Sequence, residues 1–324
     1  MSPRRRFDID ELVGGARQGQ PRAVARLISL VEDGAPELRE VAAALAPHAG
    51  RAQVVGITGP PGVGKSTSIS GLVTALRGVG KKIGVLAVDP SSPFSGGALL
   101  GDRVRMQDHT LDGGVFIRSM ATRGHLGGIA WATPQALRVL DAAGFDVVLV
   151  ETVGVGQSEV EVVSLADTTV VLLAPGMGDG IQAAKAGILE VADVFAVNKA
   201  DRDGAAQTVR DLKYMISLGR RGKDGPSWRP PIVRTVATRS EGIDDLVGAI
   251  GEHRAWMIEH GEVDARRQRR AIAEIEAIAL AQLREKLGDV RRGSPLLPGL
   301  AKRVVVGELD AYRAADELIT ELGA

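Results

Sequence analysis

The sequence GPPGVGKS at residues 59–66 decides the fold class. It fits the pattern G-x-x-x-x-G-K-[ST], in which glycines let backbone N–H groups turn inward around a phosphate. An apolar run, QVVGIT (53–58), precedes it, and a helical stretch, STSISGLVTALRG (66–78), follows it. A helix that begins directly after such a loop adds the partial positive charge of its N-terminus. This order of strand, loop and helix predicts a P-loop NTPase.

Each part of the loop has an expected role. The Lys65 ammonium group should reach the β- and γ-phosphate oxygens, and the Ser66 hydroxyl should bind Mg²⁺. The glycines and their neighbours should surround the phosphates with backbone N–H groups. The predicted nucleotide-binding residues of this segment are Gly59, Pro60, Pro61, Gly62, Val63, Gly64, Lys65, Ser66 and Thr67.

Seven short apolar runs alternate with helical stretches from residue 52 onward. Runs of this kind, ending in Gly, Asp, Asn or Pro, are typical of parallel strands buried on both faces. They are QVVGITG (53–59), KIGVLAVDP (82–90), GVFIRSM (114–120), FDVVLVET (145–152), TTVVLLAPG (168–176), DVFAVNKAD (193–201) and PIVRTVAT (231–238). The pattern predicts an α/β fold with a mostly parallel, doubly wound sheet, whose ligands bind at the carboxyl ends of the strands.

Helical extensions flank this sheet on both sides. Residues 8–48 carry an apolar stripe at helical spacing, formed by Val24, Leu27, Ile28 and Val31. After about residue 250 a long charged helix follows. Its apolar side consists of Ile272, Ile275, Ala279, Leu283 and Leu287. This helix either packs on its own sheet or forms a dimerisation arm, because an apolar stripe needs a surface to cover it.

The end of the sixth run carries a candidate reader of the base, Asn198-Lys199-Ala200-Asp201. The Asp201 carboxylate can accept hydrogen bonds from both N1–H and the exocyclic amino group of guanine. Adenine offers neither donor at that edge and would leave a carboxylate unpaired. The predicted ligands are therefore GTP and GDP. Ala237, in VATRSEGIDDL (236–246), lies where guanine-binding proteins place a backbone contact to the base.

Three acidic residues lie at or after two other strand ends. Asp89 closes the second run, Asp102 lies in the glycine-rich segment after it, and Glu151 closes the fourth. All three can approach the phosphates or the Mg²⁺ ion. Glu151 occupies the position of the Asp in the D-x-x-G motif of many GTPases, and Gly154 then supplies an N–H group suited to sensing a γ-phosphate. Val155 stands where many GTPases carry a water-orienting Gln, so we expect slow intrinsic hydrolysis that a partner accelerates.

Composition excludes several classes of function. Forty Lys and Arg residues balance forty Asp and Glu residues, so no net charge draws the chain onto nucleic acid or an anionic membrane. The absence of cysteine excludes disulfides, zinc–thiolate sites and a cysteine nucleophile. The N-terminus lacks an apolar stretch of signal-peptide length, so we expect a cytoplasmic protein.

Three long segments resemble one family in particular. VDPSSPFSGGALLGDRVRM (88–106), RSMATRGHLGG (118–128) and ETVGVGQSE (151–159) are similar to those of the MeaB-type G proteins, also labelled ArgK. The human counterpart of this family is the methylmalonic aciduria type A protein. The resemblance covers roughly residues 8 to 320. It implies a homodimeric GTPase chaperone of adenosylcobalamin-dependent methylmalonyl-CoA mutase or of a related adenosylcobalamin-dependent mutase. Such a chaperone gates cofactor delivery from an adenosyltransferase and protects the mutase from inactivation.

The resemblance also implies roles for individual residues. Lys65, Asp102 and Glu151 would form the hydrolysis network, and Ser66 and Asp89 would join the two acids around Mg²⁺. The segment PGMGDGIQAAKAG (175–187) resembles an additional switch of the family, in which Gln182 and Lys185 make nucleotide-dependent contacts. The implied parts of the chain are an N-terminal helical extension (1–50), a P-loop GTPase domain (51–255) and a C-terminal helical dimerisation arm (256–324).

Two alternative functions remain open. One is an ATPase or kinase associated with transport of lysine, arginine and ornithine, against which NKAD argues because such an enzyme gains nothing from a guanine reader. The other is a nickel-insertion GTPase of the same broad sheet class. The absence of cysteine and of a histidine-rich tract disfavours this second alternative.

Overall fold

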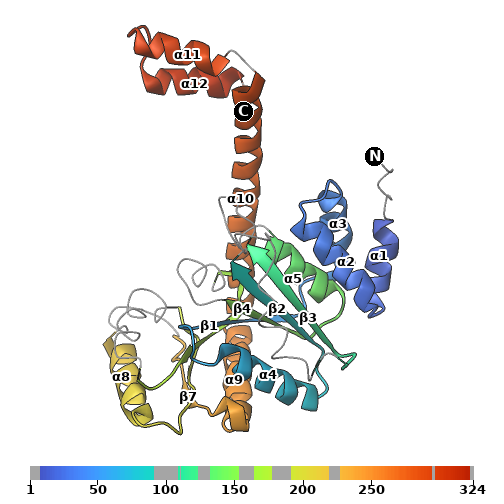
Figure 1. Ribbon diagram of the computed structural model, residues 1–324, viewed down its shortest axis with the longest axis vertical. Helices are drawn as coiled ribbons and strands as arrows, with labels where there is room; N and C mark the ends of the chain where they lie inside the picture. Colours follow the sequence, from blue (N-terminus) through green and yellow to red (C-terminus); the bar gives the residue numbers. More distant parts are fainter. Residues whose placement is uncertain are drawn as a thin grey trace. The chain divides into compact units, whose positions relative to one another are not determined.

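A seven-stranded parallel sheet forms the centre of the computed structural model, which describes residues 8–90, 109, 111–122, 132–152, 164–176, 191–218, 227–293 and 296–321 (Figure 1). Every predicted apolar run forms a strand, which confirms the predicted fold class. The strands are β1 (Gln53–Thr58), β2 (Ile83–Pro90), β3 (Val115–Thr122), β4 (Val147–Thr152), β5 (Thr168–Leu173), β6 (Val194–Val197) and β7 (Ile232–Arg234).

The order of the strands places the first of them near the middle of the sheet. The order is β3-β2-β4-β1-β5-β6-β7, and all pairs are parallel. After β1 the chain runs to one side of the sheet, returns to β4 beside β1, and then continues on the other side with β5. A crevice for ligands forms where the direction of winding reverses, at the carboxyl ends of the strands. The end of β1, between β4 and β5, is that place.

Helices cover both faces of the sheet. On one face lie α4 (Lys65–Gly78) and α9 (Ile243–Glu259), packed on alternate residues of β1 such as Val55 and Ile57. The other face carries α5 (Ala132–Ala142) and the N-terminal helices, which share an apolar core with Val148 and Val150 of β4. A third apolar cluster joins α8 (Ala205–Leu218) to β5 and β6. Because both faces are covered, the central strands are mostly apolar along their length.

Three N-terminal helices form as the apolar stripe predicts. They are α1 (Ile9–Arg17), α2 (Pro21–Glu32) and α3 (Leu38–Leu45), with a short 3₁₀ helix, η1 (Ala46–His48), after them. The Asp8 side chain caps α1 by accepting a 3.0 Å hydrogen bond from Glu11 N. Val24, Leu27, Ile28 and Val31 are all buried, which confirms the stripe. Arg118 of β3 donates to Glu32 and Ser29 of α2, so a polar contact also joins this extension to the sheet.

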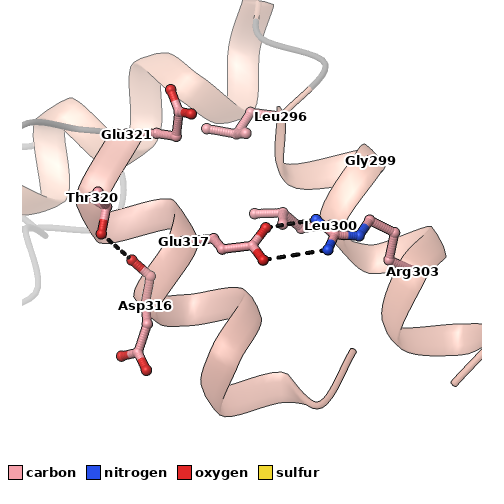
Figure 2. A pocket seen from close by; sticks show the side chains of 8 residues that line it. All are labelled: Leu296, Gly299, Leu300, Arg303, Asp316, Glu317, Thr320 and Glu321. Atoms are coloured by element: carbon pink, nitrogen blue, oxygen red, sulfur yellow. Dashed lines mark hydrogen bonds and ion pairs between the residues drawn. The ribbon is translucent and has the colours of Figure 1, made fainter. Parts of the chain in front are cut away.

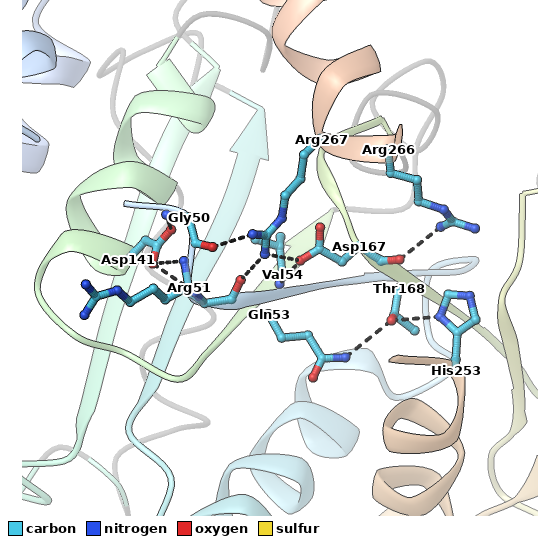
Figure 3. Close-up of polar contacts among 11 residues, drawn as sticks. Gly50, Arg51, Gln53, Val54, Asp141, Asp167, Thr168, His253, Arg266 and Arg267 are labelled. Atoms are coloured by element: carbon cyan, nitrogen blue, oxygen red, sulfur yellow. Dashed lines mark hydrogen bonds and ion pairs between the residues drawn. The ribbon is translucent and has the colours of Figure 1, made fainter. Parts of the chain in front are cut away.

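The amino ends of the strands carry a second polar network, drawn in Figure 3. Asp141, near the end of α5, accepts hydrogen bonds from the N–H groups of Gly50, Arg51 and Ala52, just before β1. Arg267, in the first turns of α10 (Glu262–Gly293), donates to Gly50 O and Ala52 O, with a distance of 3.1 Å to the latter. The beginning of α10 is therefore fixed to the chain that enters β1.

Asp193 is the centre of the neighbouring contacts. Its carboxylate accepts two hydrogen bonds from Arg266, of 2.7 and 2.8 Å, and one of 2.8 Å from Thr169 N. The Nε2 atom of the fully buried His253 lies 3.2 Å from the same carboxylate, and Nδ1 lies 2.9 Å from Thr168 Oγ1. Burial opposes ionisation of Asp193, but the contacts from His253 and Arg266 outweigh it and hold the pKa of Asp193 below its usual range.

The chain divides into two compact units, Met1–Arg267 and Gln268–Ala324. The second unit contains the rest of α10 and a pair of helices, α11 (Leu296–Val305) and α12 (Ala311–Glu321). Figure 2 shows a pocket between these two helices, across which Arg303 and Glu317 form an ion pair of 2.6 Å. Among the described residues of both units, no helix is long and apolar enough to span a membrane.

Candidate nucleotide-binding site

The loop between β1 and α4 has a backbone that only glycine allows. Gly59, directly after β1, has φ 145°, and a Cβ atom on it would lie 2.2 Å from Leu172 O in β5. Gly64, directly before α4, has φ 96°, and its Cβ atom would lie 2.5 Å from the Asn198 side chain. Gly62 has φ 79°. A residue with a side chain would be strained in each of these conformations, and at Gly59 it would also clash with the main chain.

The helix α4 begins with Lys65, the residue expected to bind the phosphates. Lys65 is 8% exposed, and its Nζ donates to Gly59 O at 2.7 Å and to Pro60 O at 3.2 Å. The ammonium group thus lies over the loop, beside the N-terminus of α4, where the first backbone N–H groups of the helix and the helix dipole favour an anion. Val63 is fully buried in the core under α4, which holds the middle of the loop in place.

A hydrogen bond connects α4 to the end of β4. Ser66 Oγ donates to Glu151 Oε1 at 2.9 Å, and Glu151 is only 4% exposed. Parallel pairing with β1 explains the contact, because Glu151 lies opposite Ile57, just before the loop. A hydroxyl and a carboxylate at this distance form an oxygen donor set, the kind that Mg²⁺ prefers. These residues fit the predicted magnesium site.

The other predicted residues of this region can be placed only in part. Asp89 lies at the carboxyl end of β2, next to β4, but its side chain is outside the described atoms. Thr67 is half-buried in the first turn of α4. Asp102, Gly154, Gln182 and Lys185 lie outside the described residues.

Asn198 joins the predicted base reader to the phosphate loop. Its Nδ2 donates to Val63 O at 2.8 Å, and its Oδ1 accepts from Ala237 N at 3.0 Å and from Thr235 Oγ1 at 3.2 Å. Lys199, with φ 57°, turns back and donates from Nζ to Gly62 O at 2.6 Å. Hydrogen bonds therefore connect the segments that follow β1, β6 and β7 at the carboxyl edge of the sheet.

The candidate guanine contacts lie on the segments after β6 and β7. Asp201 follows β6, with its side chain 40% exposed. Ala237 begins a 3₁₀ helix, η5 (Ala237–Arg239), after β7. The sequence analysis did not identify Thr235 or Arg239. Thr235 could have been found as a hydroxyl residue two positions before Ala237, whereas no local pattern marks Arg239, whose guanidinium lies 3.5 Å from Asp201.

Comparison with known proteins identifies the family. The family profile described as methylmalonyl Co-A mutase-associated GTPase MeaB matches residues 24–291. The chain belongs to this MeaB family. A protein of Pyrococcus abyssi that bears the name of a GTPase is 47% identical over 97% of each chain. The mitochondrial methylmalonic aciduria type A homolog of Mus musculus is 34% identical over 98% of this chain and 80% of its own length. The chain is thus similar to MeaB relatives along nearly its whole length.

A solved structure is similar over the same extent. The crystal structure of an LAO/AO transport system kinase aligns with a TM-score of 0.71 at 26% identity, and the alignment covers 98% of each chain. This similarity agrees with the P-loop fold. The MeaB family is a family of P-loop GTPases, and the loop, the sheet and the two strand-end segments described above are placed as a P-loop fold requires.

Proposed function

We propose that this protein binds GTP and GDP with Mg²⁺, hydrolyses GTP slowly, and serves an adenosylcobalamin-dependent methylmalonyl-CoA mutase as a nucleotide-dependent chaperone. The observation that carries the nucleotide part of the proposal is the bridge made by Asn198. One side chain connects the phosphate loop at Val63 with the second base-contact segment at Ala237. This bridge supports a site in which a single guanine nucleotide contacts the phosphate loop with its phosphates and the segments after β6 and β7 with its base.

Each end of the nucleotide has a chemical counterpart in the chain. The Lys65 ammonium group would exchange its carbonyl partners for phosphate oxygens, and the Asp201 carboxylate would accept the two N–H donors of guanine. Ser66 and Glu151 would hold Mg²⁺, together with Asp89 and Asp102. Bound there, Mg²⁺ would supply positive charge to neutralise the phosphate oxygens during phosphoryl transfer.

Slow hydrolysis follows from the residue after Gly154. Many GTPases orient the attacking water with a glutamine at this position, and the chain has Val155. Without that group, the catalytic power of the isolated chain rests on phosphate positioning and charge neutralisation. A partner that supplies or orders a water-orienting group would accelerate the reaction.

The mutase is the partner that the family description favours. The matched family is described as mutase-associated, and the mouse relative carries the name of methylmalonic aciduria. The adenosyltransferase that prepares the cofactor is a second candidate partner. We also propose a homodimer, because Ile272 and Ile275 of α10 are 65% and 67% exposed within one chain. Burial of such a stripe by a second copy would stabilise the arm.

Co-purification with the mutase tests the proposal. Full-length protein and mutase are mixed with GDP, with a non-hydrolysable GTP analogue, or without nucleotide. We expect association that differs between the two nucleotide states, and slower inactivation of the mutase during turnover. Equal association in all three conditions, with no effect on inactivation, would disprove the chaperone role.

A transport-associated kinase is the second candidate, because a solved structure of similar extent carries that name. Displacement of bound GDP distinguishes the two functions. GTP should displace GDP, and ATP at the same concentration should not. Displacement by ATP as effective as that by GTP would favour the kinase. Stoichiometric nickel binding would instead favour the insertion GTPase considered above.

A further inference from the structure

One guanidinium group lies between two carboxylates at the predicted base-reading end of the site. Arg239 Nε donates to Glu241 Oε1 at 2.7 Å, and one of its terminal nitrogens donates to Oε2 at 3.2 Å. Its other terminal nitrogen lies 3.5 Å from Asp201 Oδ2. Arg239 is thus firmly paired with Glu241 and makes a longer contact with the carboxylate that would read guanine.

The backbone that carries these three side chains is fixed by its own hydrogen bonds. Val236 N donates to Glu241 O at 3.0 Å, which closes the loop that contains η5. Ala200 N donates to Thr235 O at 3.0 Å, which ties this loop to the segment of Asp201. After the loop, Gly242 has φ 72°, and a Cβ atom there would lie 2.1 Å from Arg234 O. The relative positions of Arg239, Glu241 and Asp201 therefore do not depend on flexible backbone.

The geometry leaves Asp201 able to bind a further partner. Within the described part of the chain, Asp201 has the ion pair with Arg239 and no hydrogen bond to its carboxylate. A carboxylate has about four acceptor positions. A cation 3.5 Å from one oxygen biases the rotation of the carboxylate and still leaves room for two N–H donors. The contact with Arg239 already restricts the Asp201 side chain in the free protein. Binding of guanine then costs less side-chain entropy, so the contact increases the affinity.

We propose that Arg239 is a positioning residue for guanine specificity. Glu241 holds its guanidinium, and the guanidinium orients the Asp201 carboxylate for simultaneous contact with N1–H and the 2-amino group of guanine. This inference rests on the proposed function, because it assumes that Asp201 reads the base.

The size of the effect follows from the exposure of the pair. Exposed ion pairs are largely screened by water, so Arg239→Ala should weaken GDP binding only modestly, roughly three- to fivefold. Inosine diphosphate lacks the 2-amino group and makes only one of the two contacts, so its binding should weaken less. The ratio of GDP affinity to inosine diphosphate affinity should therefore fall. Glu241→Gln, which loosens the Arg239 side chain, should lower the same ratio.

Calorimetric titration of the full-length protein with GDP, inosine diphosphate and ADP tests the inference. Arg202→Ala is the matched control, because it removes the same charge from an exposed residue adjacent to Asp201. This control should leave the affinity ratio unchanged. Asp201→Asn should weaken GDP binding by at least about 100-fold, since it removes the charged acceptor of two hydrogen bonds.

The outcomes separate the inference from the proposed function. If Asp201→Asn abolishes the GDP preference while Arg239→Ala and Glu241→Gln leave the ratio unchanged, the positioning role is wrong and guanine binding stands. A rise in GDP affinity in Arg239→Ala would also overturn the role, because Arg239 would then compete with the base. If the ratio of GDP affinity to inosine diphosphate affinity falls equally in Arg202→Ala, the loss of any nearby positive charge explains the result, and the positioning role of Arg239 is wrong. If the unaltered protein binds ADP as tightly as GDP, both proposals fail.

Discussion

Glu151 and Ser66 show how single residues bring distant parts of the chain into one site. They are 85 positions apart in the sequence and share a hydrogen bond of 2.9 Å. A carboxylate that is only 4% exposed is costly unless polar groups or a cation compensate its charge. The Ser66 hydroxyl provides part of this compensation, and in the proposed function Mg²⁺ would provide more.

The substitution Glu151→Gln tests this interpretation at the residue scale. The amide keeps the shape of the side chain and removes the charge that would hold Mg²⁺. We expect the Mg²⁺ concentration for half-maximal GTP hydrolysis to rise roughly 10- to 100-fold. Titration of the hydrolysis rate with Mg²⁺ measures this.

Glu32→Gln provides the matched control for that titration. Glu32 is another largely buried glutamate. It pairs with Arg118 of β3, an edge strand that β2 and β4 separate from β1 and its phosphate loop. Its replacement should leave the Mg²⁺ dependence unchanged. An unchanged Mg²⁺ dependence in Glu151→Gln would remove Glu151 from the predicted metal site.

At the scale of elements, the beginning of α10 depends on the contacts of Asp193. The carboxylate binds Arg266 of α10, faces His253 of α9, and accepts a hydrogen bond from Thr169 N of β5. Three elements thus meet at one ionised group. Removing one partner of a buried ion pair leaves the other charges uncompensated, which costs more than the pair itself contributes.

We therefore expect Asp193→Asn to lower the free energy of unfolding by roughly 3 kcal/mol at neutral pH. Because the pKa of Asp193 is lowered by folding, its stabilising contribution is present above the ordinary Asp value of about 4. The contribution is lost as the pH falls through the lower pKa of the folded state. The difference between variant and unaltered protein should shrink below about pH 4.

Urea unfolding at neutral pH and at a series of pH values below 4 measures this difference. Asp203→Asn is the control, since Asp203 is exposed on the loop after β6. A difference that stays constant down to the lowest pH would show that the charge of Asp193 does not stabilise the fold.

The elements of the fold were more accessible to sequence analysis than these contacts. Each strand lies in a mostly apolar run, and the glycine pattern of 59–66 fixes the loop after β1, so local sequence predicts both. The pairing of Asp193 with Arg266, or of Arg239 with Asp201, depends on segments that meet only after folding. No spacing along the chain reveals such pairs, and both arginines look like ordinary surface residues in the sequence.

The whole molecule combines a nucleotide-binding unit with a helical unit that has an apolar stripe. We expect the double substitution of Ile272 and Ile275 by Glu to convert a dimer into a monomer, because charges on the stripe would prevent its burial. GDP affinity should stay the same, since the candidate site lies in the first unit. Sedimentation velocity measures the mass.

Val79→Glu is the matched control for this experiment. Val79 is 69% exposed, as apolar as the isoleucines, and lies at the end of α4 in the first unit. The control variant should remain dimeric. If the double variant also remains dimeric, α10 is not the contact between copies.

The contacts of Asp193 have a consequence for spectroscopy. Two of the three tryptophans of the chain, Trp228 and Trp256, lie with ring centres 5.8 Å apart, and Trp228 is 5.0 Å from the ring of His253. Trp228 Nε1 also donates to Asp193 O at 2.7 Å. The emission of an indole depends on what surrounds its ring. The intrinsic emission of the protein should therefore report, without any attached dye, on the packing of the junction between α9 and α10.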